Sequence, residues 1–467
     1  MGRAYIGLSP AFPDAAREAL ADTQLRTNLA RATGTIRTKR ANVVAEKDDW
    51  EALRTTGHAR KMRVLRDLPA LLEQFERNAV AAGATVHWAP NAAVATAIVA
   101  SIAKAKGVDS IVKVKSLATD EIGLNEALHA EDIEAKETDL AELIVQLAGD
   151  HPSHILVPAI HKNRDQIRDL FKAQLPEAAA DLSNEPRDLA MTARAHLRER
   201  FLDARMAVSG ANFAIADTGS LVVVESEGNG RMCLTLPETL VTIVGIEKVL
   251  PSFTDLDVFM QLLPRSSTGE RMNPYTTIWT GVTPGDGPQD VHIVLLDNGR
   301  VRTLADEVGR EALACIRCSA CMNVCPVYER TGGHAYGSVY PGPIGAILTP
   351  QLQGPPHAQT LPFASTLCGA CYDVCPVKIN IPEILVHLRA QVHENHDSPV
   401  ERLGFRAVAW TLAKGSRIRA LQRLNRVLAV ASALPNLLSL PVLRKWTRAR
   451  RSPSWARHSF RQWWEQR

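Results

Sequence analysis

The sequence predicts an α/β domain with a largely parallel sheet, followed by an α-helical domain that is rich in cysteine. Three observations support this fold class. Strand-like and helix-like patterns alternate from about residue 84 to residue 300, which is typical of a parallel sheet covered by helices. Seven of the eight cysteines lie between Cys315 and Cys375. The length of 467 residues suggests about two to four domains.

We expect four segments along the chain. They are an N-terminal helical segment (1–60), an α/β domain (61–300), a helical domain with the cysteines (301–395) and a basic helical extension (396–467). From Glu401 onward there are 15 Lys and Arg but only 2 Asp and Glu, whereas the whole chain has a net charge of +4. The rest of the chain is therefore acidic, and the extension is expected to contact something anionic.

The first half of the chain is predicted to begin with charged, alanine-rich helices, interrupted by a polar break at Thr55-Thr56-Gly57. Apolar residues then recur every three to four positions up to Gly83, which predicts a helix over 61–83. The α/β alternation follows. Its predicted strands cover 84–90, 110–116 and 154–160, and its predicted helices cover 91–107 and 139–149.

The second half of the α/β domain is predicted to contain a helix over 184–205 and then β-rich stretches with glycine-containing turns. These stretches cover 211–232, 239–250 and 291–300, and the domain is expected to close near Arg300. Helical patterns return from Leu304. Glycine and proline are dense over 331–357, where no long regular element is expected. A helix over 381–395 has Pro382 in its first turn.

Neither export nor membrane insertion is predicted. The first 20 residues lack the apolar core of a secretory signal. The most apolar stretch, Val427–Leu443, is short for a spanning helix and is broken by Pro435 and Pro441. We therefore expect a cytoplasmic protein whose cysteines meet a reducing environment, where such patterns bind metals more often than they form disulfides.

The first cysteine motif is C-x2-C-x2-C-x3-C-P, formed by Cys315, Cys318, Cys321, Cys325 and Pro326. This spacing matches that of bacterial ferredoxins. There, three thiolates of one motif bind one cubane iron–sulfur cluster, and the fourth thiolate binds the other cluster of the pair. Short two-residue intervals allow one tight loop to present three sulfurs to the same cluster.

The second motif is shorter by one ligand. When the two motifs are aligned on their Cys-Pro pairs, Cys375 takes the fourth place, Cys371 the third and Cys368 the second. The first place falls on Ser365. The second motif therefore offers three thiolates and a hydroxyl.

Cross-ligation between the two motifs predicts two clusters. One would be bound by Cys315, Cys318, Cys321 and Cys375, and the other by Cys325, Cys368 and Cys371. We favour [4Fe–4S] for both. For the second, three outcomes stay open: a [3Fe–4S] centre, a [4Fe–4S] centre with Ser365 or water on one iron, or a fourth ligand from elsewhere.

The alternative to iron–sulfur clusters is a zinc site with four cysteine ligands in C-x2-C pairs. Seven cysteines with two Cys-Pro endings favour iron–sulfur. Cys233 stands alone in "GRMCLTLPE" and is expected to be a small buried residue. Two neighbouring clusters form a one-electron relay. No GxGxxG, Walker loop or nucleophile elbow accompanies them, so electron transfer is favoured over hydride transfer.

Around the cysteines the chain resembles the lactate utilization protein B family. The resemblance rests on "CIRCSACMNVCPVYERTGGHAYGSVYPGPIGAILTP" and "LCGACYDVCPVKINIPEIL", in which "GGHAYGSVYPGPIG" is more specific than the cysteines alone. It extends over nearly the whole chain. It implies a LUD α/β domain, similar in fold to sugar-phosphate isomerases and CoA transferases, then a ferredoxin-like iron–sulfur domain and the basic extension.

The resemblance also implies a function. The family belongs to a three-protein system that oxidises L-lactate to pyruvate and allows growth on lactate. This subunit would be its electron carrier, with two [4Fe–4S] clusters, and the missing thiolate at Ser365 is a trait of the family. The implied partners are a Cys-rich subunit and a second LUD protein.

Two other functions stay open. In the first, the LUD domain itself acts on a hydroxy acid in a cleft at the strand ends, with Thr218, Gly219, Ser220, Glu225 and Asn229 as candidates. A glycine-rich turn explains the same stretch, and we prefer it. The second is the iron–sulfur subunit of a glycolate-type oxidase. Such subunits usually have two full motifs and further cysteine repeats, whereas no cysteine follows Cys375 here.

The remaining candidates are polar residues near the motifs and the basic extension. His151, His154 and His161 are interpreted as solvated loop residues or strand-end caps rather than ligands. His334, Tyr336 and Tyr340 would either donate hydrogen bonds to cluster sulfurs or pack against the domain. The extension is expected to contact a partner, a respiratory acceptor or the inner face of the membrane. Nucleic-acid binding is not expected.

Overall fold

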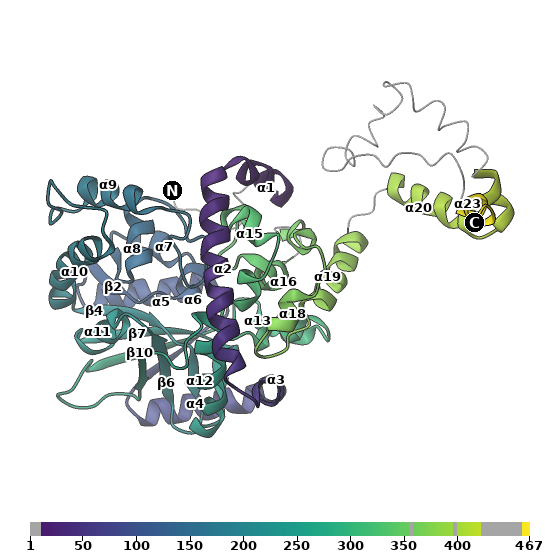
Figure 1. Ribbon diagram of the computed structural model, residues 1–467. Coiled ribbons are helices and arrows are strands. Elements are labelled where there is room, and N and C mark those ends of the chain that lie inside the picture. The colour runs from purple at the N-terminus through teal and green to yellow at the C-terminus, as the bar shows by residue number, and fades with distance from the viewer. Residues whose placement is uncertain (1–10, 355–357, 396–398, 422–459) are drawn as a thin grey trace. The chain divides into compact units, whose positions relative to one another are not determined.

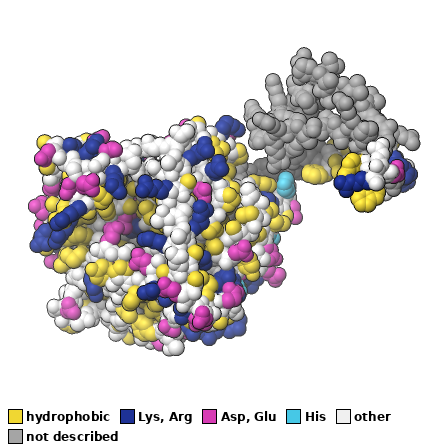
Figure 2. Space-filling model, in the orientation of Figure 1, with side chains coloured by type: hydrophobic (Ala, Val, Ile, Leu, Met, Phe, Trp, Pro, Cys, Tyr) yellow, Lys and Arg dark blue, Asp and Glu magenta, His cyan; other side chains and the backbone are white. Residues whose placement is uncertain are grey.

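The computed structural model describes residues 11–354, 358–395, 399–421 and 460–467 (Figure 1). The chain divides into two compact units, Met1–Val392 and His393–Arg467. The larger unit contains both β-sheets and all the cysteines. On its visible face, positive and negative side chains are interspersed (Figure 2), so the acidic balance of this unit does not form one acidic area on that side.

A six-stranded parallel sheet forms the centre of the larger unit, as the alternating pattern predicts. Its order is β1-β10-β7-β4-β2-β3, and every neighbouring pair is parallel. The strands are β1 (Thr85–Ala89), β2 (Ser110–Lys113), β3 (Glu134–Glu137), β4 (Met206–Gly210), β7 (Thr239–Gly245) and β10 (Asp290–Leu296). Because helices cover both faces, the central strand β7 is buried at every residue.

Alternate residues of these strands pack into separate apolar cores, and Val291, Ile293 and Leu295 of β10 belong to the core that contains the clustered cysteines. Val208 and Val241 point into one core with helices α5 (Ala92–Ala105) and α7 (Leu124–His129). Their neighbours Ala207 and Leu240 point into a second, since successive side chains of a strand face opposite sides. The second core is covered by α8 (Leu140–Leu147), α9 (Arg164–Gln174), α10 (Pro186–Asp203) and α11 (Asn229–Thr235).

A second, four-stranded sheet lies beside the first and has the order β8-β5-β6-β9. It consists of β5 (Phe213–Ile215), β6 (Ser220–Glu225), β8 (Val249–Leu250) and β9 (Tyr275–Trp279). Its inner face packs with α4 (Leu68–Ala81) and α12 (Phe253–Ser267) in the core that also contains the clustered cysteines. The β-rich pattern predicted strands here but not their division into two sheets, because a pattern does not specify pairing.

The N-terminal helices α1 (Phe12–Ala21), α2 (Thr23–Ala45) and α3 (Trp50–Arg66) connect the parts of the larger unit. Figure 1 shows α2 running along the whole unit, and it contacts α12 as well as the short helices of the cysteine-rich segment. The N-terminal segment therefore packs against both later parts of the chain.

The predicted break at residues 55–57 is wrong, because α3 continues through it. The hydroxyls of Thr55 and Thr56 donate to the carbonyls of Glu51 and Ala52, four residues earlier, at 2.9 Å each. These bonds satisfy the hydroxyls within the helix. At Gly57 a Cβ would lie 2.6 Å from Leu262 Cδ1, so this glycine allows close packing on α12 and does not end the helix.

The single helix predicted over 61–83 is two helices, α3 and α4, separated at Asp67. Pro69 lies in the first turn of α4, where its missing N–H removes no helical hydrogen bond. The ring of Pro69 also prevents α3 from continuing as one helix through this position. The C-terminal end near Gly83 agrees with the prediction, since Gly83 has a φ of 95°.

The strand predicted over 154–160 is also wrong, because this segment consists of bends and turns. The backbone amides of Leu156 and Val157 donate to Nδ1 of His154 at 3.0 and 3.1 Å. The amide of Ser153 donates to the carbonyl of Pro158 at 2.9 Å. These local bonds replace those of a sheet, so the segment curls around the His154 ring.

The cysteine-rich segment consists mostly of short helices, with two longer ones, α16 (Gly342–Gln353) and the predicted α19 (Ile381–Asn395). Its other elements are α13 (Arg300–Ala305), η2 (Gly309–Ala314), α14 (Ala320–Asn323), α15 (Tyr328–Thr331), η3 (His334–Tyr336), η4 (Leu361–Phe363) and α18 (Ala370–Val374). Helix α16 contradicts the expectation of no long element over 331–357. Pro343 lies in its first turn, and all but one of its residues are buried, so tertiary packing stabilises it despite Pro350.

The smaller unit contains α20 (Pro399–Leu412) and α23 (Phe460–Glu465) in its described part. Leu403, Phe405 and Trp410 of α20 are exposed. Within the described ranges, no helix is both long and apolar enough to cross a membrane. The apolar stretch Val427–Leu443 and most of the basic residues of the extension lie outside the described residues.

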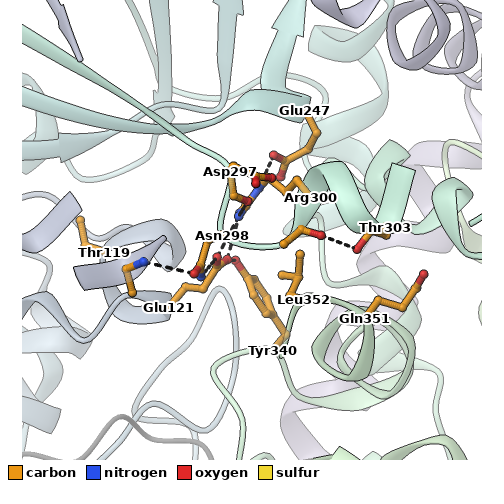
Figure 3. A network of polar contacts seen from close by, with 12 residues as sticks. Thr119, Glu121, Glu247, Asp297, Asn298, Arg300, Thr303, Tyr340, Gln351 and Leu352 are labelled. Carbon is orange, nitrogen blue, oxygen red and sulfur yellow. Dashed lines mark hydrogen bonds and ion pairs between the residues drawn. The ribbon is translucent and has the colours of Figure 1, made fainter. Parts of the chain in front are cut away.

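A buried polar network joins the sheet to the cysteine-rich segment (Figure 3). Arg300 donates to both carboxylate oxygens of Glu121 at 2.8 and 2.9 Å and to Glu247 at 2.5 Å. The Tyr340 hydroxyl donates to Glu121 at 2.5 Å. Glu247 belongs to η1 (Ile246–Lys248) at the end of β7, and Glu121 belongs to α6 (Leu117–Glu121). Each acid therefore has a charged partner despite its burial.

We predict that Arg300→Met lowers the free energy of unfolding by about 3–5 kcal/mol, because Glu121 and Glu247 would remain buried without their cation. The measurement is urea-induced unfolding followed by circular dichroism. Arg187→Met, at an exposed position of α10, is the matched control and should change stability little. A loss of less than about 1 kcal/mol for Arg300→Met would contradict the importance of this network.

Candidate iron–sulfur site

The two cysteine motifs adopt the same backbone conformation. Arg317 and Ser319 flank Cys318 with φ values of 62° and 60°, and Leu367 and Gly369 flank Cys368 with 56° and 83°. Each motif then enters a short helix, α14 or α18, that carries the next cysteine. The two short helices contact each other. The aligned positions are therefore structurally equivalent, and the motifs form an internal pair.

Four cysteines, which come from both motifs, line one small cavity. They are Cys315, Cys318, Cys321 and Cys375. All four are buried, and the rest of the lining is mostly apolar, including Ile155, Ile344 and Ile379. This is the set that cross-ligation predicts for one cluster.

The remaining three clustered cysteines, Cys325, Cys368 and Cys371, lie beside one another. Burial raises the pKa of Cys371 to about 12, and the neighbouring Cys325 and Cys368 contribute to that rise. Cys325 and Cys371 are buried, whereas Cys368 is exposed. The second set thus reaches the protein surface.

The two sets adjoin each other. Burial raises the pKa of Cys321 well above its ordinary value, and Cys371 is among the neighbours that raise it further. Cys321 belongs to the first set and Cys371 to the second, so these two sulfurs mark where the sets meet.

Backbone amides donate to three of the sulfurs. The donors are the N–H groups of Arg317 to Cys315 at 3.3 Å, Tyr328 to Cys325 at 3.5 Å and Ile379 to Cys375 at 3.3 Å. Such bonds stabilise negative charge on sulfur. Burial acts in the opposite direction and raises the pKa of Cys375 to about 11. The Cys375 thiol is therefore protonated near neutral pH unless a metal displaces its proton.

Cations from the N-terminal helices lie next to the first set. Arg54 of α3, which is buried, donates to the carbonyls of Cys375 and Tyr372 at 2.9 and 3.1 Å. Arg40 of α2 donates to the carbonyl of Val374 at 2.9 Å. A cubane held by four thiolates carries net negative charge, which these guanidinium groups would offset. Sequence reasoning missed both arginines, because they are more than 300 residues from Val374 and Cys375, whose carbonyls they bind.

These residues fit iron–sulfur clusters. The first set offers four converging sulfurs in a cavity largely closed to water, with amide donors and nearby cations. At the second set, Tyr336 lies beside Cys325. Within the described part of the chain its buried hydroxyl has no other hydrogen-bond partner, and it could donate to a cluster sulfur. A single zinc ion would use only four of the seven sulfurs.

Neither Ser365 nor Cys233 supplies a further sulfur ligand to the two sets. Ser365 is half-buried, and its hydroxyl accepts the N–H of Leu367 at 3.1 Å. Cys233 is buried in the core beneath the large sheet, with its sulfur 3.5 Å from the Thr138 hydroxyl. Because the chain has eight cysteines in all, the second set has three thiolates and no further one in the chain to complete it.

The candidate cleft residues over 218–229 fall into two groups. Thr218, Gly219 and Ser220 lie at the start of β6. A Cβ on Gly219 would meet the backbone of Ala79 at 2.3 Å, so this end is closed by α4. Glu225 and Asn229 lie at the other end of β6 and do line a cleft. The predicted site is therefore divided, and only its second half remains a candidate.

The histidine candidates have structural contacts. His154 is buried, not solvated as expected, and its Nε2 lies 3.2 Å from Asn323 Oδ1 in α14. Burial lowers the pKa of His154 to about 4, so the ring is neutral. His161 and His334 meet Asp150, with ligand atoms within 4.8 Å of one another. The Lys162 ammonium also donates to Asp150 at 2.8 Å.

Comparison with known proteins agrees with this architecture. Residues 72–296 match the LUD domain family, and residues 311–379 match the 4Fe-4S dicluster domain family. The chain is thus a LUD-domain protein with an iron–sulfur dicluster domain. The segment boundaries predicted from the sequence stay predictions.

Several curated relatives are similar over almost their full length. The chain is 40% identical to lactate utilization protein B of Bacillus licheniformis over 98% of this chain and 96% of that protein. It is 39% identical to lactate utilization protein B of Bacillus subtilis, with coverages of 98% and 96%, and 40% identical to that of Lysinibacillus sphaericus, with coverages of 98% and 97%. The chain belongs to the lactate utilization protein B family.

We predict that, in protein stripped of metal under anaerobic conditions, iodoacetamide alkylates Cys368 first because it is exposed. The buried cysteines should react at least about tenfold more slowly at pH 8. For Cys371 the rate should rise about tenfold per pH unit toward pH 10, because its raised pKa keeps the reactive thiolate scarce. Mass spectrometry of peptides measures each rate. Equal rates at Cys318 and Cys368 would contradict the burial described above.

Proposed function

We propose that this chain is the iron–sulfur electron-transfer component of a system that oxidises L-lactate to pyruvate and allows growth on lactate. One observation carries the proposal: four sulfurs from two separate motifs line one cavity, and three more adjoin them. The family relationship supports the choice of pathway, because the curated relatives bear the name lactate utilization protein B.

The proposed ligands follow from the two sets. Cys315, Cys318, Cys321 and Cys375 would hold one [4Fe–4S] cluster, and Cys325, Cys368 and Cys371 would hold the other. For the second cluster we propose a fourth ligand that is not a thiolate, because Cys233 is the only other cysteine in the chain and lies in a different core. Because Cys368 is exposed, water or a group from a partner could reach the iron of the second cluster that lacks a thiolate.

The arrangement of the sets suits a relay of single electrons. When bound, each cluster supplies a centre that accepts and releases one electron. The protein's part is to hold the two sets in contact, to exclude water from the first set and to bring the second to the surface at Cys368. Electrons would thus enter at the buried end and leave at the exposed end.

The proposal extends to partners and location. The C–H bond of lactate would be broken on or beside a partner, and a Cys-rich subunit and a second LUD protein would complete a cytoplasmic complex. The basic extension, with exposed Leu403, Phe405 and Trp410 in α20, would contact a respiratory acceptor or the inner membrane surface. A glycolate-type oxidase subunit is less well supported, because no cysteine follows Cys375.

We predict that Cys315→Ala abolishes growth on L-lactate but leaves growth on glucose unchanged, since the first set would lose one of its four sulfurs. Cys233→Ala is the matched control, because it removes a buried thiol outside both sets and should preserve growth on lactate. Complementation of a strain that lacks the native gene measures both. Normal growth on lactate with Cys315→Ala would refute the proposed role.

We predict that the anaerobically purified chain contains about eight iron atoms if both clusters are [4Fe–4S], and about seven if the second is [3Fe–4S]. Iron and sulfide analysis with electron paramagnetic resonance (EPR) spectroscopy distinguishes the two. Cys325→Ala should remove only the second cluster and Cys375→Ala only the first. Loss of the same cluster in both variants would contradict the crossed ligand sets.

A further inference from the structure

A cleft opens at the carboxyl ends of three neighbouring strands of the large sheet. Lys115 follows β2, Gly210 ends β4 and Gly245 ends β7, and all three line the cleft. In open parallel sheets, ligands bind at this edge. The opposite wall is formed partly by the cysteine-rich segment, through Arg317 and Tyr340.

The cleft and the cavity of the first cysteine set share a wall. Ile155 and Arg317 line both of them. Arg317 lies between Cys315 and Cys318 in the chain, and its own amide donates to the Cys315 sulfur at 3.3 Å. A molecule in the cleft would therefore be separated from the first set by a single layer of side chains.

The Arg317 guanidinium is buried beside the Cys315 thiol, and one of its nitrogens remains unpaired. Its side chain is only 9% exposed, and it packs 4.7 Å from the centre of the Tyr340 ring. Its Nη2 reaches Glu247 at 3.4 Å, but that carboxylate is bound more closely by Arg300 at 2.5 Å. Among the described residues, Nη1 of Arg317 is buried and has no hydrogen-bond partner. Such a donor is costly to bury unless something binds it.

The other acidic residues of the cleft do not supply a partner for Nη1, and backbone amides donate to each of them. Asp139 accepts the N–H groups of Ala141 and Glu142 at 3.0 and 3.1 Å. Glu225 accepts those of Gly230 and Arg231 at 2.8 and 2.7 Å. Glu227 accepts the N–H of Leu140 at 3.3 Å. Their charges are thus directed at the starts of α8 and α11.

Two further groups make the cleft suitable for a small polar anion. Lys248 lines it, and its ammonium donates to the Cys315 carbonyl at 3.4 Å, which is a long contact. Asn273, in the loop before β9, also lines it, and in the described structure its buried side-chain Oδ1 has no hydrogen-bond partner. The cleft therefore offers one unpaired guanidinium nitrogen, the side-chain amine of Lys248 and an unpaired amide oxygen.

We propose that this cleft binds a small carboxylate of the 2-hydroxy or 2-oxo acid class. The carboxylate is held by Arg317 with Lys248, and the 2-oxygen is held by the Asn273 amide. Arginine suits a carboxylate because its planar fork matches the two oxygens. The choice of acid rests on the proposed function; the presence of an anion site rests only on the cleft. The site places the acid next to the first cysteine set.

Isothermal titration calorimetry on the full, anaerobically purified chain with its iron tests this inference. The probes are L-lactate, pyruvate, acetate and inorganic phosphate. We expect lactate and pyruvate to bind, and Arg317→Gln to weaken both about 10–100-fold. Arg317→Lys should restore part of the affinity. Arg187→Gln, on the exposed side of α10, is the control and should bind as the unmodified chain does.

A second variant and an EPR spectrum distinguish loss of acid binding from loss of the cluster. Asn273→Ala, on the sheet side of the cleft, should weaken lactate more than acetate, because acetate has no 2-oxygen. Bound lactate should also shift the EPR spectrum of the reduced first cluster, and Arg317→Gln should remove the shift while the iron content is unchanged. If Arg317→Gln loses iron, Asn273→Ala decides the question.

The inference is overturned if neither acid binds, if both variants bind as the unmodified chain does, or if phosphate binds more tightly than either acid. None of these outcomes affects the electron-transfer role, which rests on the growth and iron content of the cysteine variants. Conversely, acid binding by a chain whose Cys315→Ala variant still grows on lactate would support the site and refute the proposed function.

Discussion

Convergence of cysteine sulfurs from two distant motifs is the constraint on which the rest of this structure depends. Cys375 must meet three sulfurs that lie about 50 residues earlier in the chain. This requirement brings α14 against α18 and closes the intervening segment into a buried wrap that contains α16. The matching left-handed residues around Cys318 and Cys368 show that both motifs place a cysteine in the same kind of tight turn.

The LUD domain and the cysteine-rich segment share a buried polar network in addition to a common apolar core. Arg300 binds Glu121 and Glu247 at the edge of the large sheet, and the Tyr340 hydroxyl donates to Glu121. Burial makes each of these groups costly alone, so the network favours one relative placement of sheet and wrap. The N-terminal helices are also joined to the cysteine-rich segment by polar contacts, because Arg40 and Arg54 place cations beside the first cysteine set.

The cleft, the first cysteine set and the second cysteine set follow one another in that order within the larger unit. The cleft at the sheet edge adjoins the first, buried set of sulfurs through Arg317 and Ile155. The first set adjoins the second through Cys321 and Cys371, and the second reaches solvent at Cys368. A path for electrons from a bound acid to an external partner would follow this order. The fold would then serve mainly to fix short distances between centres while keeping the first centre dry.

The sequence by itself determined the parallel α/β domain, the helical cysteine-rich domain and the family, because periodicity and cysteine spacing are local properties of the chain. It also predicted which four sulfurs would be neighbours, since ferredoxin spacing carries that information. It misjudged Thr55–Gly57, residues 154–160 and α16, where packing against distant residues outweighs local preference. Only the tertiary structure placed Arg40, Arg54 and Arg317 around the sulfurs and divided Thr218 from Asn229. Those relations join residues far apart in the chain or at opposite ends of one strand, and no local pattern records which of them meet.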